Sequence, residues 1–117
     1  MVTNKGKKIS GGRYIKQRKK KKYEITGQRT ITKLGNTKRK TIKTRGGNKK
    51  TILLMEKFVN INGKRIEIKN VLETPSNKFL ARQNIITKGT IVDTQLGKVK
   101  ITNRPTQEGI LNGVLFK

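Results

Sequence analysis

The sequence has no cysteine, no histidine and no tryptophan, and each of the first two absences removes a class of function. Without cysteine the chain forms no disulfide and no thiolate metal site, which fits a reducing compartment. Without histidine it lacks the commonest general base and most zinc ligand sets. No apolar run approaches the ~20 residues that span a bilayer, and no signal-peptide core follows Met1. We therefore expect a soluble, cytoplasmic protein.

Acidic residues are also scarce. The 117 residues include six Asp and Glu and 30 Lys and Arg, which gives a formal net charge of +24. The acids form no evident pair and the chain has no GxxxxGK[ST] loop, so we expect no enzyme, no cofactor, no metal site and no small-molecule substrate. A charge of this size repels itself in a compact chain and attracts polyanions, which indicates a nucleic-acid partner.

The positive charge is concentrated in the first half of the chain. Residues 1–50 carry 19 Lys and Arg and one acid, Glu24, whereas residues 51–117 carry 11 Lys and Arg and five acids. Apolar residues in the front are too scattered to offset a backbone ordering cost of about 1–2 kcal/mol per residue. We expect residues 1–37 to form a basic extension that is disordered without RNA, and residues 38–117 to form one folded domain.

The second half has the pattern of short β-strands. We expect strands over Lys38–Thr44, Thr51–Ile61, Lys64–Thr74, Thr90–Thr94, Lys98–Thr102 and Ile110–Phe116, with Phe79–Ile86 either a strand or a helical turn. Six or seven antiparallel strands with turn signals between them predict an all-β fold, either a small barrel or a sandwich. We favour a small closed β-barrel, because closure removes exposed strand edges.

Turn residues set the register of these strands. Asn62-Gly63 is typical of a type I′ hairpin, which needs positive φ at both central positions. The alternation slips at Val71-Leu72, which indicates a bulge or a bend at a barrel corner. Gly113 predicts a bend or a close contact. Residues 95–97 are expected to join two strands, and residues 104–109 to form a loop.

The stretch Thr44–Lys50 combines glycines, an asparagine and flanking cations. Gly46, Gly47 and Asn48 tolerate positive φ, so the backbone can turn sharply and approach an anion closely. An ordinary hairpin turn between two strands explains the same residues. The two interpretations are compatible, since a turn would position Arg45 and Lys49 beside a phosphate.

A second basic cluster covers Arg18–Lys22. It neutralises RNA phosphates in one interpretation and is a solvated tail in the other; the lack of any acid within it favours the first. Tyr14 and Tyr23 would stack on unpaired bases or serve as packing anchors. The residues that we predict to contact RNA are Arg13, Lys16, Arg18, Lys19, Lys20, Lys21, Lys22, Tyr23, Arg29, Lys33, Lys38, Arg39, Lys40, Lys43, Arg45, Gly46, Gly47, Asn48, Lys49 and Lys50.

Several blocks of the chain, in order, resemble the S8e family of small-subunit ribosomal proteins, in its short archaeal form. They are Ser10-Gly11-Gly12-Arg13, Lys22-Tyr23-Glu24, Thr32-Lys33-Leu34-Gly35, Arg45-Gly46-Gly47-Asn48-Lys49, Asn84-Ile85-Ile86-Thr87-Lys88-Gly89, and Gly97-Lys98 to Arg104-Pro105. Two positions depart from the family pattern: Gly27-Gln28-Arg29, where a proline is usual, and Gln83, where a second arginine is usual.

The resemblance implies a β-barrel whose basic arm threads into small-subunit ribosomal RNA, with other small-subunit ribosomal proteins as neighbours and the cytoplasmic ribosome as location. The implied role is a structural constituent in translation. A ribosome-assembly factor with a similar barrel is the alternative, although such factors usually carry long extra segments. A membrane-surface polycation would need an amphipathic helix, and the arm has no apolar face for one.

Overall fold

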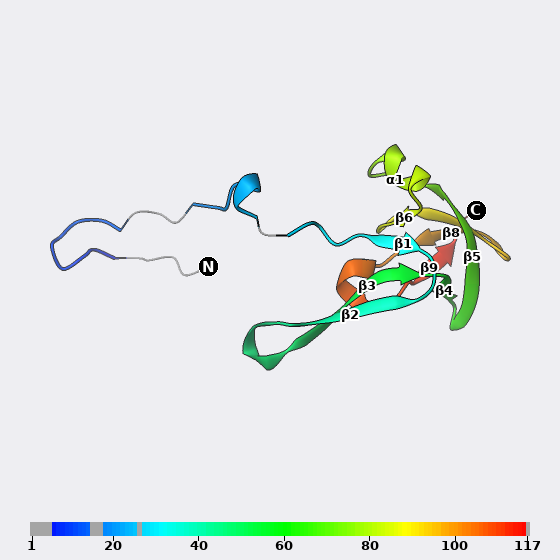
Figure 1. Cartoon of the computed structure of the whole chain (residues 1–117), viewed down its shortest axis with the longest axis horizontal. Helices are drawn as coiled ribbons and strands as arrows, with labels where there is room; N and C mark the ends of the chain where they lie inside the picture. The colour runs from blue at the N-terminus through cyan, green and yellow to red at the C-terminus, as the bar shows by residue number, and fades with distance from the viewer. Residues whose placement is uncertain (1–5, 15–17, 26, 117) are drawn as a thin grey trace.

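The computed structural model describes residues 6–14, 18–25 and 27–116. Within them the chain forms nine strands in two sheets, two short α-helices and two 3-10 turns (Figure 1). The strands are β1 (Thr32–Leu34), β2 (Lys38–Lys43), β3 (Lys49–Glu56), β4 (Phe58–Ile61), β5 (Lys64–Glu73), β6 (Ile85–Ile86), β7 (Ile91–Thr94), β8 (Gly97–Ile101) and β9 (Gly113–Leu115). The helices are α1 (Lys78–Arg82) and α2 (Pro105–Glu108), and the 3-10 turns are η1 (Lys22–Glu24) and η2 (Arg45–Gly47).

The five-stranded sheet closes on itself. Its order is β4-β5-β7-β8-β9, and each neighbouring pair is antiparallel. The two outer strands then meet, because the Asn60 N–H donates to the Leu111 carbonyl at 2.9 Å and Asn60 bridges Asn112 in parallel. Closure satisfies backbone groups that an open edge would expose. The predicted all-β barrel is confirmed.

The four-stranded sheet has the order β2-β3-β1-β6. Its strand β1 runs parallel to β3 and antiparallel to β6, whereas we expected only antiparallel strands. The Thr32 side chain in β1 is fully buried and its hydroxyl donates to the Leu53 carbonyl at 2.7 Å. Residues 32–34, which we placed in the basic extension, therefore lie inside this sheet.

The strand count differs from the six or seven predicted, for local reasons. β1 and β6 have only three and two residues, which is too few for a visible alternation. The expected single strand Thr51–Ile61 divides into β3 and β4 at Lys57, where the chain bends. Residues 79–86, left open between strand and helix, contain both: α1 ends at Arg82 and β6 follows it.

The predicted turns are largely confirmed. Asn62 and Gly63 have φ of 47° and 78°, as a type I′ hairpin between β4 and β5 requires. The register of β5 against β7 shifts between Ile68 and Asn70 and again between Val71 and Glu73, so the predicted bulge is present.

Two expectations near the C-terminus were wrong in detail. Within residues 104–109, which we expected to form a loop, Pro105–Glu108 form the helix α2. The sequence contains the usual start and stop residues of a helix: Pro105 occupies the first helical turn, and Gly109, with φ of 73°, ends the helix in the left-handed conformation. The final strand is Gly113–Leu115, shorter than predicted.

One apolar core fills the barrel. Its buried members come from both sheets and are Leu53, Val59, Ile61, Ile68, Val71, Ile86, Val92, Val99, Ile101 and Leu111. Gly113 lies against this core, and a β-carbon there would collide with Val99 and lie 3.2 Å from Val59 Cγ2. The predicted close contact at Gly113 is confirmed, and it lets β9 pack onto the barrel.

Glu56 is buried at the end of β3, only 2 % exposed, and it joins several elements. One carboxylate oxygen accepts from the Thr37 hydroxyl at 2.6 Å and Arg65 Nη2 at 3.2 Å, and the other accepts from Arg39 Nη2 at 3.2 Å. The backbone N–H groups of Lys57 and Phe58 donate to the first of these oxygens, at 3.3 and 3.4 Å. These bonds hold the bend that separates β3 from β4.

The surroundings of Glu56 favour its charged form. Burial by itself raises the pKa of the Glu56 carboxyl, but the hydrogen bonds from Thr37, Arg65 and the two backbone N–H groups outweigh burial and lower this pKa below its ordinary value of 4.5. The folded chain therefore holds Glu56 ionised at a pH where the unfolded chain begins to protonate it.

We predict that Glu56→Gln lowers the free energy of unfolding at neutral pH by about 1–3 kcal/mol, because the glutamine amide cannot accept all these hydrogen bonds. The contribution of Glu56 is complete above pH 4.5 and is lost as the pH falls through its lowered folded-state pKa. Denaturant titrations of both proteins at several pH values should show the stability difference shrinking in acid.

Glu67→Gln removes an exposed carboxylate paired with Lys57 and is the control, with an expected change below about 1 kcal/mol. A difference that is constant with pH would contradict the role of Glu56.

Candidate nucleic-acid interface

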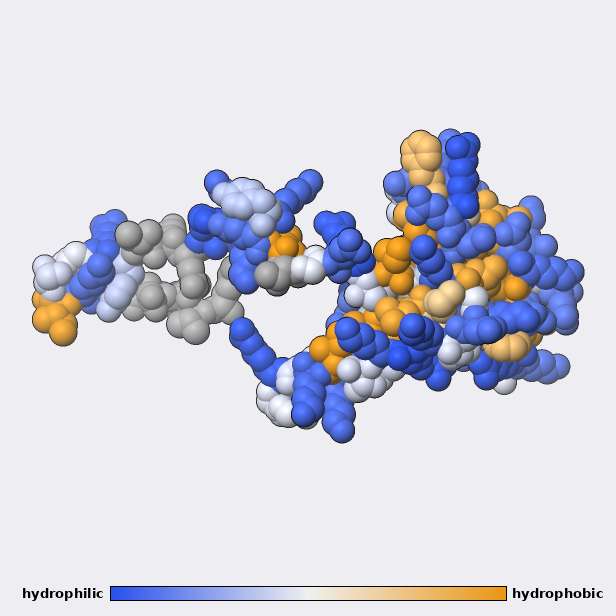
Figure 2. Space-filling model, viewed as in Figure 1, coloured by the Kyte–Doolittle hydropathy of each residue, from blue (hydrophilic) through white to orange (hydrophobic). Residues whose placement is uncertain are grey.

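Two basic segments project from the barrel. One is the arm, defined here as the described part of residues 6–31, and the other is the β2–β3 hairpin, residues 38–56. Both extend from the same side of the barrel in Figure 1, and Figure 2 shows hydrophilic side chains over most of both. They make the molecule elongated, with extents of 69 × 32 × 25 Å and a radius of gyration of 19.8 Å against about 13 Å for a compact chain of this length.

The arm has no core of its own. Its described side chains are exposed except for Glu24, which is half-buried. A small turn at its start is held by backbone bonds of 2.8 Å from the Lys8 N–H to the Gly12 carbonyl and from the Gly11 N–H to the Lys8 carbonyl. Ile9, Ile25 and Ile31 are exposed as well, so burial does not fix the path of the arm.

Arg18 of the second basic cluster forms an ion pair with Glu24, which lies just beyond the cluster. The Arg18 guanidinium donates to both oxygens of Glu24, at 2.5 and 2.8 Å, and the Lys21 N–H donates to the same carboxylate at 3.0 Å. The pKa of Glu24 is lowered, first by Arg18 and then by the Lys21 backbone. Within the described residues, the lysines at 19–22 form no ion pair and remain open to an external anion.

Tyr14 and Tyr23 lie on the arm and away from the core. They are 45 % and 77 % exposed, and each ring has a lysine ammonium near its face: Lys8 Nζ at 5.9 Å and Lys21 Nζ at 5.8 Å from the ring centroids. Neither ring acts as a packing anchor for the barrel in this structure. Both have surface available for stacking on a base.

The tip of the β2–β3 hairpin is the glycine turn predicted from the sequence. Gly46 and Gly47 both have φ of 76°. The Thr44 N–H and hydroxyl donate to the Asn48 carbonyl at 2.7 and 3.0 Å, and Asn48 Nδ2 donates to the Arg45 carbonyl at 3.5 Å. Most residues with a side chain do not adopt this left-handed conformation. With glycine at both positions, the backbone of the tip has no side chains there.

Cations face one another across this hairpin. Lys43 lies directly opposite Lys49, and Lys50 lies opposite Ile42, with Arg45 at the tip between the strands. Like charges at directly opposed positions destabilise a strand pair. The hairpin's only acid, Glu56, is buried at the far end of β3 and already paired. The tip is therefore a site of uncompensated positive charge that an anion would stabilise.

The structure separates the predicted RNA-contacting residues into three groups. Lys16 lies outside the described residues. Arg39 is bonded within the protein although its side chain is 45 % exposed: Nε donates to the Gly109 carbonyl at 3.0 Å and Nη2 to Glu56. Lys50 is half-buried and donates to the Gln107 side chain in α2. The others are exposed on the arm, on β1 or on the hairpin, and are Arg13, Arg18, Lys19, Lys20, Lys21, Lys22, Tyr23, Arg29, Lys33, Lys38, Lys40, Lys43, Arg45, Gly46, Gly47, Asn48 and Lys49.

Sequence reasoning missed the polar cluster around Glu56 and the pairing of Arg65 with Phe58, whose ring centroid is 4.4 Å from the guanidinium carbon. A single acid at the end of the apolar run Ile52–Met55 was the available signal for the cluster. In the part of the chain that the structure describes, no three His, Cys, Asp or Glu side chains gather as metal ligands. No helix among those residues has the length and apolar character that a membrane span requires.

We predict that Arg39 and Lys40, neighbours in β2, differ in their contribution to stability. Arg39→Ala removes bonds to Gly109 and to buried Glu56, and should lower the free energy of unfolding by about 1–3 kcal/mol. Lys40→Ala removes an exposed cation and should change it by less than about 0.5 kcal/mol. Thermal and denaturant unfolding of both variants measures the difference. Equal effects would show that Arg39 is only a surface charge.

Comparisons of the sequence with known proteins identify its family. The family model "Ribosomal protein S8e" matches residues 2–116. Proteins named "Small ribosomal subunit protein eS8" are 48 % identical in Nanoarchaeum equitans over 115 residues, 46 % in Staphylothermus marinus over 118 and 39 % in Methanocorpusculum labreanum over 117. The matches cover 93 %, 95 % and 95 % of this chain and 91 %, 92 % and 94 % of those proteins. The chain belongs to the ribosomal protein S8e family.

Proposed function

We propose that this protein is a structural constituent of the small ribosomal subunit and that it binds small-subunit ribosomal RNA through the arm and the tip of the β2–β3 hairpin. The names of the relatives support the first part. The observation that carries the second is the uncompensated positive charge on two projections from one side of the barrel. The role is binding and scaffolding within the cytoplasmic ribosome, without catalysis.

Phosphates are the expected targets of both projections. An A-form RNA helix hides its base edges in a deep, narrow groove and presents phosphates and 2′-hydroxyls instead. The lysines at 19–22 are long and exposed, so they can follow a phosphate backbone of varied shape. At the hairpin tip, Gly46 and Gly47 let Arg45 and Lys49 approach a phosphate without steric hindrance from neighbouring side chains.

The barrel then has a mechanical role. Glu56, paired with Arg65 of β5, fixes the base of the hairpin to the closed sheet, and β1 fixes the end of the arm between β3 and β6. Two basic segments thus leave one rigid body and enter RNA at separate points. Such a protein would restrain the relative positions of the RNA segments it contacts.

Salt dependence tests this proposal. Binding of a small-subunit ribosomal RNA transcript should weaken linearly in log salt, with a slope of magnitude near 0.9 for each phosphate neutralised. Replacing the four lysines at 19–22 by glutamine should reduce this slope by up to about 3–4, and replacing Lys43, Arg45 and Lys49 by up to about 3.

The matched control replaces the exposed barrel lysines Lys64, Lys69, Lys98 and Lys100, and should change the slope much less. Equal losses in all three variants would indicate nonspecific attraction and contradict the proposed interface.

We also propose that the arm orders only on RNA. Backbone amides of residues 18–25 should exchange rapidly in the free protein, because the described arm buries no apolar side chain, and should gain protection in the RNA complex. The barrel amides of β7 and β8 provide an internal reference that is protected in both states. Strong protection of residues 18–25 without RNA would refute arm ordering.

Sedimentation distinguishes the structural role from that of an assembly factor. A structural constituent stays with mature small subunits after a high-salt wash. Retention on precursor particles alone would defeat the proposed role and favour the assembly factor.

A further inference from the structure

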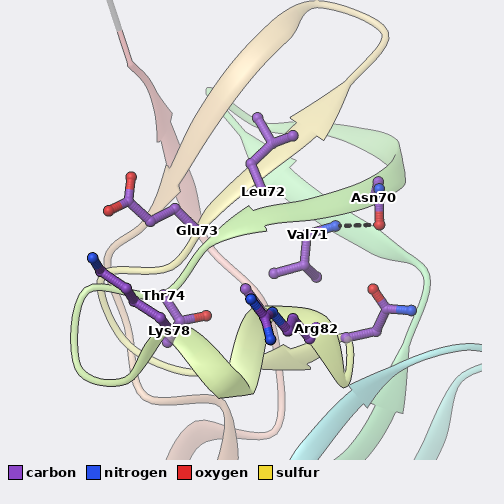
Figure 3. A pocket seen from close by; sticks show the side chains of 9 residues that line it. Asn70, Val71, Leu72, Glu73, Thr74, Lys78 and Arg82 are labelled. Atoms are coloured by element: carbon purple, nitrogen blue, oxygen red, sulfur yellow. Dashed lines mark hydrogen bonds between the residues drawn. The ribbon is translucent and has the colours of Figure 1, made fainter.

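A pocket separate from both projections lies between α1 and the C-terminal half of β5 (Figure 3). Its volume is about 620 Å³, within the usual range for small-ligand sites. Val71 and Ala81 supply apolar wall, and Lys78 and Arg82, one helical turn apart on α1, line the same pocket. In Figure 1, α1 lies at the upper edge of the barrel and the β2–β3 hairpin at the lower edge.

The pocket contains an unexplained polar atom. Thr74 is fully buried, and among the described residues its hydroxyl oxygen is the buried side-chain atom that has no hydrogen-bond partner. Figure 3 shows this side chain at the end of β5 with its oxygen turned toward the space between β5 and α1. This oxygen is closed to solvent, so a ligand group reaches it only if the side chains that cover it move. An unsatisfied buried hydroxyl destabilises a fold by about 1–3 kcal/mol, so such a group would then have a favourable partner.

Two amides add further hydrogen-bonding capacity. Asn70 lines the pocket from the bulge of β5, and its Oδ1 accepts from the Val71 N–H at 2.9 Å, which leaves its Nδ2 as a donor. Asn84 lines the pocket beyond the end of α1, where its φ of 54° turns the chain toward β6. Hydroxyl and amide groups beside an apolar wall match the edge and face of a nucleobase.

The charges at the pocket indicate how the ligand is attached. Lys78 and Arg82 contribute two cations and Glu73 one anion, which leaves a single net positive charge. One phosphodiester carries one negative charge. A free nucleoside triphosphate carries several, which the Glu73 carboxylate would repel. A nucleotide within a chain therefore fits better than a free triphosphate.

We propose that this pocket binds one unpaired nucleotide of an RNA strand, with the base between β5 and α1 and its phosphate beside Lys78 and Arg82. The inference rests on the proposed function, since it gives the RNA-binding protein a third contact. It adds a base-binding site on the barrel to the two phosphate-binding projections. Thr74 is the residue that most clearly separates this site from an ordinary surface hollow.

The test uses the full-length protein labelled with ¹⁵N and the dinucleotides adenylyl-adenosine and uridylyl-uridine, each with one phosphodiester. Saturable chemical-shift changes in the amides of Thr74, Ala81 and Asn84 are expected with at least one of them. Dimethyl phosphate supplies the phosphodiester without a base, and adenosine supplies a base without the phosphodiester; both should produce weaker binding.

Thr74→Val provides the decisive variant, because valine keeps the shape and removes the hydroxyl. It should raise the melting temperature, since an unsatisfied buried group is lost, yet weaken dinucleotide binding about 3- to 10-fold, the usual effect of one hydrogen bond. Lys78→Ala should weaken binding as well, whereas Lys100→Ala on β8 is the matched control and should not.

Three outcomes would overturn the inference. They are absence of shifts at the pocket, equal binding of dimethyl phosphate, and unchanged affinity in Thr74→Val. Transcript binding by the arm and hairpin variants is measured separately, so the pocket can fail while the proposed function stands. Loss of salt-dependent transcript binding would instead defeat the proposed function itself.

Discussion

A buried carboxylate holds the two parts of this structure together. Glu56 is the single acid of the β2–β3 hairpin, and it is enclosed where β3 turns into β4. A charge removed from water is strongly unfavourable unless it is paired and hydrogen-bonded. Arg39 from β2, Arg65 from β5 and Thr37 provide those partners. The base of the hairpin and the closed sheet are thereby fixed to one another in a single geometry.

This arrangement separates stability from binding along the chain. Apolar residues are concentrated in the barrel, where closure between β4 and β9 encloses one core. Cations without partners are concentrated on the arm and at the hairpin tip, where little is buried. Self-repulsion among them opposes folding less when they project away from the core and from each other. The same separation exposes them to an RNA partner, which would remove the repulsion.

Local sequence signals were sufficient for much of the fold. Alternation placed most long strands, and Asn62-Gly63 and Gly46-Gly47 located two hairpin turns through their need for positive φ. The slip at Val71-Leu72 marked the bulge of β5. These features depend on neighbours within a few residues. The sequence did not predict β1 and β6, because they are too short to show an alternating pattern. They form because distant segments lie side by side, in the order β3-β1-β6.

The candidate interface divides in the same way. Composition alone indicated a basic arm and a basic turn, because charge density needs no knowledge of packing. It could not indicate that exposed Arg39 donates hydrogen bonds to Glu56 and to the Gly109 carbonyl, which is 70 positions away in the sequence. Nor could it reveal the pocket beside α1, whose lining comes from β5 and from residues on either side of Arg82.

The sequence by itself determined the fold class, the basic character of the first half and the family, since each depends on composition, periodicity or ordered local motifs. Only the tertiary structure decided which strands pair, that β1 runs parallel to β3, and which cations are bonded to other parts of the chain. The physical reason is that pairing and burial depend on residues distant in sequence, and their positions are fixed only when the barrel closes.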